Sequence, residues 1–361
     1  MSTTPAVMPR TMNTDTDQSS DQPSWKEMLA PFERPDARRG VLQIATSLLP
    51  YLALTTLSYL TLGHPVWLTV LLAIPSAGFL VRTFVVFHDC AHGSLLPSRK
   101  ANVRVGTFLG LFVLTPYARW KHEHAVHHAT SGDLDRRGVG DVYTLTVGEY
   151  HQLPPKSRLA YRLFRNPLIM FGIGPIFAMI IGPRLVGKDA RPRMRNSVLQ
   201  TDAVLAVIFG LAFWLLGWEF VAFVWAPGAL LAGSAGIWLF YVQHQFEDAY
   251  WQSGENWNYA EAALQGSTYL KLPKILQFFS GSIGLHHVHH LNHKIPNYHL
   301  QSAHDSHPVF SDVPTIGIAD GMRAVRFKLI DERSGKLVTF AQGRRSVALA
   351  TARPAVGAEA I

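Results

Sequence analysis

Residues 65–92 read PVWLTVLLAIPSAGFLVRTFVVFHDCAH, a long apolar run that ends in a histidine cluster. No charged residue occurs in residues 64–81, and about 20 apolar residues in a helix cross the roughly 30 Å hydrocarbon layer of a bilayer. Similar runs occupy residues 41–62, 200–218 and 220–243. We therefore expect an all-α integral membrane protein whose four transmembrane helices form two hairpins, at about residues 41–62, 65–87, 199–217 and 220–243.

The distribution of charge predicts how these spans are oriented. The chain is 48% hydrophobic and 16% charged, with a net charge of +8, and the short turns near residues 63–65 and 217–219 contain no Lys or Arg. If both turns face one side, every Lys and Arg except Arg82 faces the other. The positive-inside rule then places both termini and the histidine clusters in the cytoplasm, as in a bacterial inner membrane. The basic charge is explained by topology and anionic lipid, so no nucleic acid partner is implied. Arg82 should reach the interface or pair with an acid.

The remaining segments predict one domain with two tails. Residues 1–24 are rich in Ser, Thr, Asp and Pro and are expected to be a disordered N-terminal tail. Residues 25–340 form a single membrane domain, in which residues 88–198 and 244–340 build a cytoplasmic helical cap. Residues 105–118 and 167–183 are too short to span and are expected to be interfacial or re-entrant helices. Residues 341–361 are expected to form a flexible C-terminal tail.

Three histidine clusters predict a metal centre in the cap. Offsets of three and four residues share one helix face, and neutral imidazole binds zinc, copper, iron or nickel. Eight such ligands are too many for one ion, which predicts a dimetal site; the alternative is satisfied interfacial histidines. Cys90, the only cysteine, could add a thiolate, but a small buried residue is favoured; no disulfide within the chain or self-contained iron–sulfur cluster is possible. The clustered histidines are His88, His92, His124, His127, His128, His286, His289 and His290.

These clusters resemble the signature of the membrane fatty acid desaturase and hydroxylase superfamily, which is HxxxH followed by two HxxHH boxes. The resemblance covers roughly residues 40 to 310. The three-residue gap in the first box and the phrase HHLNHKIPNY at residues 289–298 look like the methyl-end (Δ12-type) acyl-lipid desaturases. The segment YVQHQFE at residues 241–247 is similar to the one that supplies a further ligand in this family, so the resemblance adds His244 as a ninth.

The resemblance implies an enzyme that introduces a cis double bond into a fatty acyl lipid or acyl thioester. Removing hydrogens from an unactivated CH2–CH2 unit needs an oxidant that no side chain provides, and two iron ions (Fe2+/Fe3+) with O2 as co-substrate would provide it. The chain contains no GxGxxG fingerprint, cysteine motif or fused haem domain. An external donor such as ferredoxin or a cytochrome b5-like protein is therefore expected to supply electrons.

Some assignments stay open at the level of sequence. Either His286 or His287 could face the metal, although spacing favours His286. His122, His287 and His293 are expected near the site or at the surface, while His151, His299, His304 and His307 should matter little. Five acids could accept hydrogen bonds from ligand N–H groups, namely Asp89, Glu123, Glu247, Asp248 and Asp141.

Two other functions compete with desaturation. A hydroxylase or carotenoid ketolase could use the same scaffold, because small changes in where hydrogen is abstracted separate the two outcomes. A non-catalytic metal transporter or sensor is a more distant alternative. A transporter is expected to carry ionisable residues deep inside its spans, and these spans have none at mid-depth.

Overall fold

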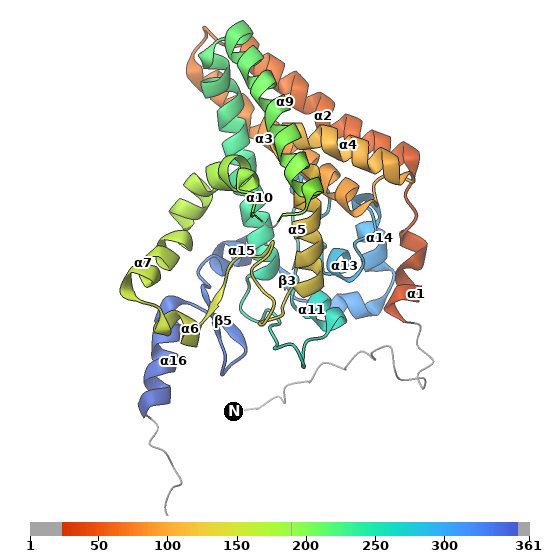
Figure 1. Ribbon diagram of the computed structural model, residues 1–361. Coiled ribbons are helices and arrows are strands. Elements are labelled where there is room, and N and C mark those ends of the chain that lie inside the picture. Colours follow the sequence, from red (N-terminus) through yellow and green to blue (C-terminus); the bar gives the residue numbers. More distant parts are fainter. Residues whose placement is uncertain (1–23, 189, 353–361) are drawn as a thin grey trace, which may run out of the picture.

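The computed structural model describes residues 24–188 and 190–352. Four long apolar helices form the elongated bundle at the top of Figure 1, and all four are long and apolar enough to cross a membrane. They are α2 (Ala37–Leu60), α3 (Val66–His92), α9 (Pro192–Leu216), and α10 (Ala226–His244) continued backwards by η5 (Phe220–Trp225). The four predicted spans are confirmed; the first three extend several residues further on the side of the cap, and the fourth extends one residue further, to His244.

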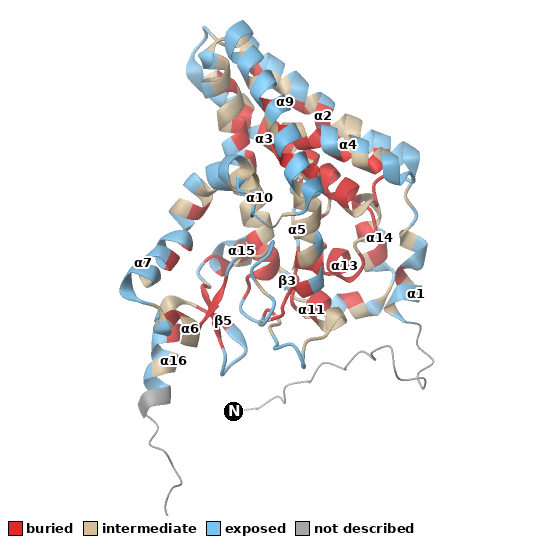
Figure 2. Ribbon diagram, in the orientation of Figure 1, coloured by how far each residue is buried: buried red, intermediate tan, exposed pale blue. Residues whose placement is uncertain are grey.

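The bundle keeps its apolar surface on the outside, as a lipid-facing helix bundle does. Trp214 is 78% exposed and Leu60 is 67% exposed, and Figure 2 shows exposed residues along the outer faces of α2 and α9. The centre of the bundle is α3, which packs against both α2 and α10 and contributes most to the largest buried apolar cluster. Because α3 is central, its last turn carries His88 and His92 into the interior of the protein.

Arg82 contacts neither an acid nor the exposed interface. It is buried within α3, donates to the carbonyl oxygen of Phe278 and to Oε1 of Gln43, and its guanidinium lies 4.0 Å from the Phe278 ring centroid. The expected pairing with an acid is therefore wrong for the part of the chain that the structure describes. Arg82 instead joins α2 and α3 to α12 (Lys274–Phe279).

Two segments expected to be interfacial are more complex than single helices. Residues 105–118 contain the end of α4 (Arg99–Phe112) and the start of α5 (Tyr117–Thr130). Residues 167–183 lie in a mostly π-helical run that bends by 59° relative to α7 (Pro155–Phe164), and α7 with this run is apolar enough to count as a fifth span. The run consists of η2 (Ile169–Ile173), α8 (Gly174–Ile176), η3 (Phe177–Ile181) and η4 (Gly182–Arg184).

Below the bundle, short elements form the cap that covers the ends of α3 and α10 (Figure 1). Its second apolar core is built around α13, where Leu285, Val288 and Leu291 are almost completely buried. The cap helices are α1 (Trp25–Leu29), η1 (Ala30–Phe32), α6 (Val147–Gln152), α11 (Tyr259–Gln265), α12, α13 (His286–Leu291), η6 (Asn297–His299), α14 (Leu300–Asp305), η7 (Pro308–Asp312), α15 (Ile318–Ala324) and α16 (Phe340–Ala352).

Two small sheets accompany these helices. In one, β1 (Leu145–Thr146) runs parallel to β4 (Leu329–Asp331), which pairs antiparallel with β5 (Lys336–Val338). In the other, β2 (Tyr269–Leu270) and β3 (Thr315–Ile316) pair in parallel. The sheets join segments that are far apart in sequence, and they leave the fold mostly helical.

The start of the C-terminal segment is more ordered in structure than the sequence predicts. Residues 340–352 form α16, which packs against α6 and β4, where the sequence predicts a flexible tail from residue 341. Partly buried Phe340 and Val347 pack on the small cluster around Leu329, which explains why this segment is helical. Residues 353–361 and nearly all of the expected N-terminal tail, residues 1–23, lie outside the described residues.

Candidate metal centre

The first two candidate ligands come from the last turn of α3. His88 is buried and His92 is half-buried, and α3 ends immediately afterwards because Gly93 adopts a left-handed conformation with φ 79°. The adjacent Cys90 is buried and its carbonyl oxygen accepts a hydrogen bond of 2.7 Å from the hydroxyl of Tyr117. This contact fixes the start of α5 against the end of α3.

A close approach between α4 and α5 sets the direction of α5. A Cβ on Gly106 would lie 2.2 Å from the Tyr117 ring, so only glycine permits this packing. The helix that follows presents the second cluster to the end of α3. The ring centroids of His88 and His124 are 4.8 Å apart, which places residues from two distant segments in contact.

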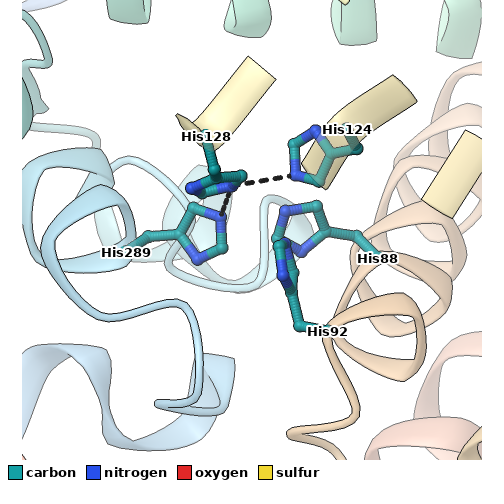
Figure 3. A group of neighbouring side chains, drawn as sticks. All are labelled: His88, His92, His124, His128 and His289. Atoms are coloured by element: carbon teal, nitrogen blue, oxygen red, sulfur yellow. Dashed lines mark hydrogen bonds between the residues drawn. The ribbon is translucent and has the colours of Figure 1, made fainter. Parts of the chain in front are cut away.

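Five imidazoles converge in one group, which we call the five-histidine group. Their candidate donor atoms all lie within 4.8 Å of one another. Nε2 of His128 lies 3.1 Å from Nε2 of His124 and 3.0 Å from Nε2 of His289, and Figure 3 shows the rings facing a shared point from α3, α5 and α13. The members are His88, His92, His124, His128 and His289.

The other four imidazoles form a second group, which we call the four-histidine group. Its donor atoms also lie within 4.8 Å of one another, and every member is buried. Nε2 of His127 is 3.2 Å from Nε2 of both His244 and His290, and Nε2 of His244 is 2.9 Å from Nε2 of His286. Together the two groups contain all nine histidines that the sequence selected.

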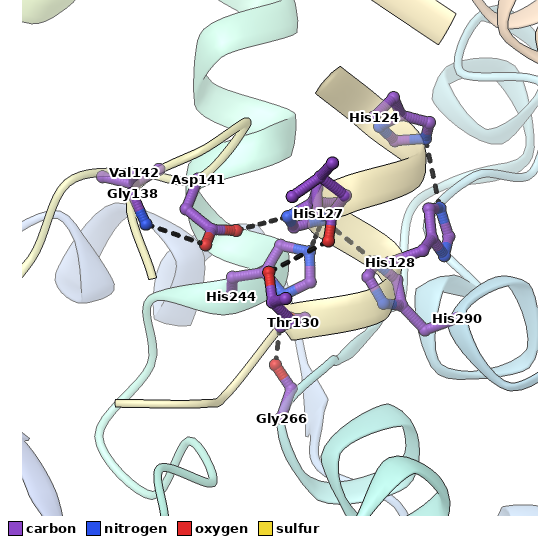
Figure 4. A network of polar contacts seen from close by, with 12 residues as sticks. His124, His127, His128, Thr130, Gly138, Asp141, Val142, His244, Gly266 and His290 are labelled. Carbon is purple, nitrogen blue, oxygen red and sulfur yellow. Dashed lines mark hydrogen bonds and ion pairs between the residues drawn. The ribbon is translucent and has the colours of Figure 1, made fainter. Parts of the chain in front are cut away.

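The hydrogen bonds in the four-histidine group determine which ring nitrogens are free. Nδ1 of His127 bonds to the Asp141 carboxylate, and Nδ1 of His244 bonds at 3.2 Å to the Gly266 carbonyl oxygen (Figure 4). Those acceptors require an N–H, and a neutral imidazole has only one. In the neutral forms of His127 and His244, the facing Nε2 atoms therefore both present lone pairs. Two lone pairs 3.2 Å apart cannot hydrogen bond to each other, whereas a cation bound to both would stabilise them.

Burial keeps five of the candidate ligand rings neutral. Desolvation first, and neighbouring imidazoles second, hold the pKa of several of the candidate ligands outside the spans well below that of a free imidazole: His124, His128, His286, His289 and His290. Nδ1 of His128 and Nδ1 of His286 are buried and have no hydrogen-bond partner in the part of the chain that the structure describes. Neutral imidazoles with free lone pairs are the form that binds transition metals, so the residues present fit a pair of metal ions.

Two of the five predicted acids contact the histidines. Oδ1 of Asp89 lies 3.2 Å from Nδ1 of His88, its own neighbour, and Oδ2 accepts from the backbone and side-chain nitrogens of Asn297. Asp141 bonds to His127 as described above. Both acids are thus in the position of acceptors that orient metal-binding imidazoles.

The other three acids lie elsewhere. Glu123 pairs with Arg119 at 2.9 Å on the same helix. Glu247 and Asp248 are exposed, and Asp248 pairs with Lys336 at 2.6 Å. Among the described residues, no carboxylate belongs to either histidine group. The donor set is therefore all imidazole.

The structure separates the three ambiguous histidines from both groups. His287 points away from the centre, and its Nε2 lies 3.0 Å from Nδ1 of His304. Burial, then the neighbouring His304, lowers the pKa of His287 to about 3. The His293 ring lies 4.9 Å from the His92 ring but is outside the five-histidine group, and His122 is half-buried.

Aromatic side chains border both groups on the side of the spans. Trp120 stacks on His124 with centroids 4.3 Å apart and also contacts Phe84 and Phe87 of α3. Phe240, in α10, lies 5.2 Å from the His127 ring. The two groups therefore have an apolar border towards the membrane-spanning helices.

A small opening reaches the four-histidine group from the cap. His127, Asp141, His244 and Gln245 line it together with residues 131–132 and 250–251, and it has room for roughly one water-sized molecule. This opening connects His127 and His244 to the side of the molecule formed by the cap loops.

Two hydrogen-bonding partners at the site, the Gly266 carbonyl and Asn297, were not predicted from the residue pattern. The Gly266 carbonyl bonds to His244 from 22 residues away, and backbone atoms carry no sequence signal. Asn297, which holds Asp89, lies in the HHLNHKIPNY phrase, so only the resemblance could have pointed to it.

Comparisons with known proteins agree with this arrangement. A family model described as fatty acid desaturase matches residues 65–314. A fatty acid desaturase of Bacillus subtilis (strain 168) is 41% identical over 319 residues, which cover 88% of this chain and 91% of that protein.

Two proteins of Synechocystis sp. are more distant. An sn-1 oleoyl-lipid 12-desaturase is 29% identical over 241 residues, covering 63% of this chain and 64% of that protein. An sn-1 acyl-lipid omega-3 desaturase (ferredoxin) is 30% identical over 234 residues, covering 61% of this chain and 62% of that protein. The matched family region begins at the start of α3 and includes all nine histidines.

Proposed function

The chain belongs to the fatty acid desaturase family, and from this membership we propose that it is an O2-dependent fatty acyl desaturase that introduces a cis double bond into an acyl chain. The observation that carries the proposal is the convergence of nine imidazoles into two adjacent groups at the ends of α3 and α10. The substrate would be a fatty acyl lipid or acyl thioester. The overall reaction would consume one O2, two acyl-chain hydrogens, two external electrons and two protons, and would release two water molecules.

Each histidine group would hold one iron ion. Bound iron would supply the O2 chemistry needed to remove hydrogens from an unactivated CH2–CH2 unit. The protein's own contribution is to orient the imidazoles through Asp89, Asp141 and the Gly266 carbonyl. Trp120 and Phe240 would exclude water from the side on which the acyl chain arrives.

The acyl chain would reach the centre from the membrane. The apolar border formed by Trp120 and Phe240 faces the spans, and the residues that form the cap lie on the opposite side of the histidines. The Lys and Arg distribution supports a cytoplasmic position for the cap and both termini. A cytoplasmic cap above a membrane-facing entrance would let a lipid chain and soluble reductants reach the same centre from different sides.

An external protein would supply electrons. The chain has no flavin, haem or iron–sulfur motif of its own. One related protein of Synechocystis is named as using ferredoxin, which supports ferredoxin or a b5-like haem protein as the class of donor. Turnover of the purified chain with NAD(P)H alone would contradict this part of the proposal.

Expression in a host that lacks the product would test the proposed function. Gas chromatography of host fatty acids, with and without a co-expressed ferredoxin system, should show a new cis-unsaturated species that depends on the donor. The His124→Ala variant provides the inactive control. Hydroxy or keto products without unsaturated ones would favour the hydroxylase alternative. Metal uptake by proteoliposomes without any change in their acyl chains would favour the transporter.

A further inference from the structure

We propose that Arg165 is a positioning residue for His244, which it holds in the four-histidine group by fixing the last turn of α10. The inference rests on the proposed metal centre. His244 is the one candidate ligand outside the three histidine boxes, and it belongs to the end of a membrane-spanning helix. Some part of the cap must therefore set where that helix ends.

Arg165 is the residue that joins the end of α10 to the cap. It follows α7 directly, and its side chain is completely buried, with 0% exposure. One terminal nitrogen donates to the carbonyl oxygen of Tyr143 at 3.0 Å and to Oγ1 of Thr144 at 3.1 Å. The other donates to the hydroxyl of Tyr241 at 3.0 Å, to Oε1 of Gln245 at 2.8 Å and to the carbonyl oxygen of Phe327 at 3.2 Å.

Two of these acceptors flank His244 on α10. Tyr241 is one helical turn before His244, and Gln245 is the next residue and the C-cap of the helix, with φ −119° and ψ 72°. Both side chains are almost completely buried. Tyr241 in turn donates to the Phe327 carbonyl oxygen, so the helix end is tied to the segment that precedes β4.

Other contacts hold the opposite side of the same turn. Gln243 donates to the Ile283 carbonyl oxygen at 2.9 Å, and Nδ1 of His244 bonds to the Gly266 carbonyl oxygen. These contacts orient the ring, but they do not fix how far α10 extends. The Arg165 contacts do, because they bind the residues before and after His244 at once.

The absence of a charged partner in the described part of the chain indicates that Arg165 serves to position the groups that accept its hydrogen bonds. No carboxylate pairs with it in residues 24–188 or 190–352, and burying a guanidinium without a counter-ion is costly. The two terminal nitrogens of its planar fork, which carry four N–H groups, instead contact five neutral acceptors, so that one N–H is shared between two of them. A lysine ammonium is a compact donor and cannot reach acceptors on both sides of the fork. Lysine should therefore fail to replace arginine here.

Two buried tyrosines provide a matched pair of variants for the test. Tyr241 and Tyr161 each donate a hydroxyl proton to a backbone carbonyl oxygen, those of Phe327 and Lys328 respectively. Only Tyr241 also accepts from Arg165 and belongs to α10. Tyr241→Phe removes two hydrogen bonds, one of them from Arg165, whereas Tyr161→Phe removes two hydrogen bonds, with Leu145 and Lys328, that do not involve α10.

The experiment measures metal binding by the purified full-length chain. Metal-free protein is titrated with Co2+ and followed by visible absorption, and bound iron per chain is measured separately. For Arg165→Lys and Tyr241→Phe we expect the second ion to bind about tenfold or more weakly, with an altered Co2+ spectrum. Tyr161→Phe should bind two ions with the wild-type spectrum. Thermal unfolding of all variants shows whether each is folded.

Three outcomes would overturn the inference. If Arg165→Lys and Tyr241→Phe bind two ions with the wild-type spectrum and only unfold at lower temperature, Arg165 is a structural residue without a role at His244. If Tyr161→Phe loses the second ion as readily as Tyr241→Phe, the effect is not specific to α10. If the wild-type chain binds no ions at all, the proposed centre fails, and the role of Arg165 fails with it.

Discussion

Nε2 of His127 lies 3.2 Å from Nε2 of His244, and when both rings are neutral their single N–H is used at Nδ1. His127 belongs to α5 and His244 to the end of α10, 117 residues apart. Two buried lone pairs directed at each other are unfavourable unless a cation lies between them. This relationship is the strongest geometric argument for a metal ion in the four-histidine group.

Loss of His244 should remove one ion. We expect His244→Ala to reduce bound iron from two ions to about one per chain, because only three imidazoles then remain in the four-histidine group. Desaturation should fall to the background of the host. His64→Gln is the control, since His64 is exposed in the turn between α2 and α3. Elemental analysis of purified protein and fatty acid profiles would measure both effects. Full metal content and activity in His244→Ala would contradict the assignment.

Substitution of Asp141 and substitution of Glu247 should have different effects on metal binding, although the sequence made both acids candidates for orienting a ligand. Asp141 contacts His127, whereas Glu247 is exposed. Asp141→Asn should weaken metal binding by about 10- to 100-fold, because the carboxylate that orients the ring loses its charge. Glu247→Gln should leave binding unchanged. Competition against a chelator gives the two affinities, and equal values would show that Asp141 has no role at the centre.

Lys328 should lower the stability of the protein at neutral pH. Its side chain is buried, Nζ has no hydrogen-bond partner among the described residues, and burial first and Arg165 second lower the pKa of this ammonium to about 7. Between pH 7 and the normal lysine pKa near 10.5, the unfolded chain binds the proton and the folded chain does not. The free energy of unfolding therefore rises with pH across this window.

The Lys328→Met variant tests whether the free energy of unfolding changes with pH in this direction. The variant should be more stable than wild type by about 1 to 3 kcal/mol at or below pH 7, and the difference should shrink as the pH rises towards 10. Lys336→Met is the control, because Lys336 is paired with Asp248 at the surface. Thermal unfolding in detergent at pH 6.5 and 9.5 provides the measurement. A difference that grows with pH would refute the assignment.

Removal of metal should destabilise the cap. Without ions, the Nε2 lone pairs of the four-histidine group face each other in a buried site, and bound ligand stabilises the folded state by about 2.7 kcal/mol at 100 times its Kd. Chelation should therefore lower the unfolding temperature, and Fe2+ should restore it. An unfolding temperature that does not respond to chelator would show that the histidines are stable without metal.

The apolar runs were enough to predict the spans, and the histidine spacing was enough to select eight of the nine candidate ligands; the ninth, His244, came from the family resemblance. Both are local properties: the length of a run decides whether a helix crosses a bilayer, and helical spacing decides which residues share a face. The sequence-based expectation that each HxxHH box faces a single point was too simple. His124 and His128 lie in the five-histidine group while His127 lies in the other, and His289 is separated from His286 and His290 in the same way.

That division follows from helix geometry combined with packing. Consecutive residues point about 100° apart, so the last two histidines of each box cannot face the same ion. Which ion each one faces depends on how α5 packs against α3, α10 and α13. The choice of His286 over His287 was likewise settled by contacts, since His287 pairs with His304.

The sequence by itself determined a four-span membrane protein with eight histidines at helical spacing in three boxes, because hydropathy and helical periodicity act over short stretches of chain; the family resemblance added His244. Only the tertiary structure decided how those histidines divide between two groups, that Asp141 and the Gly266 carbonyl orient them, and that Arg165 ties the end of α10 to the cap. Those features depend on hydrogen bonds between segments that are distant in sequence, and the geometry of such bonds is set by packing and not by local composition.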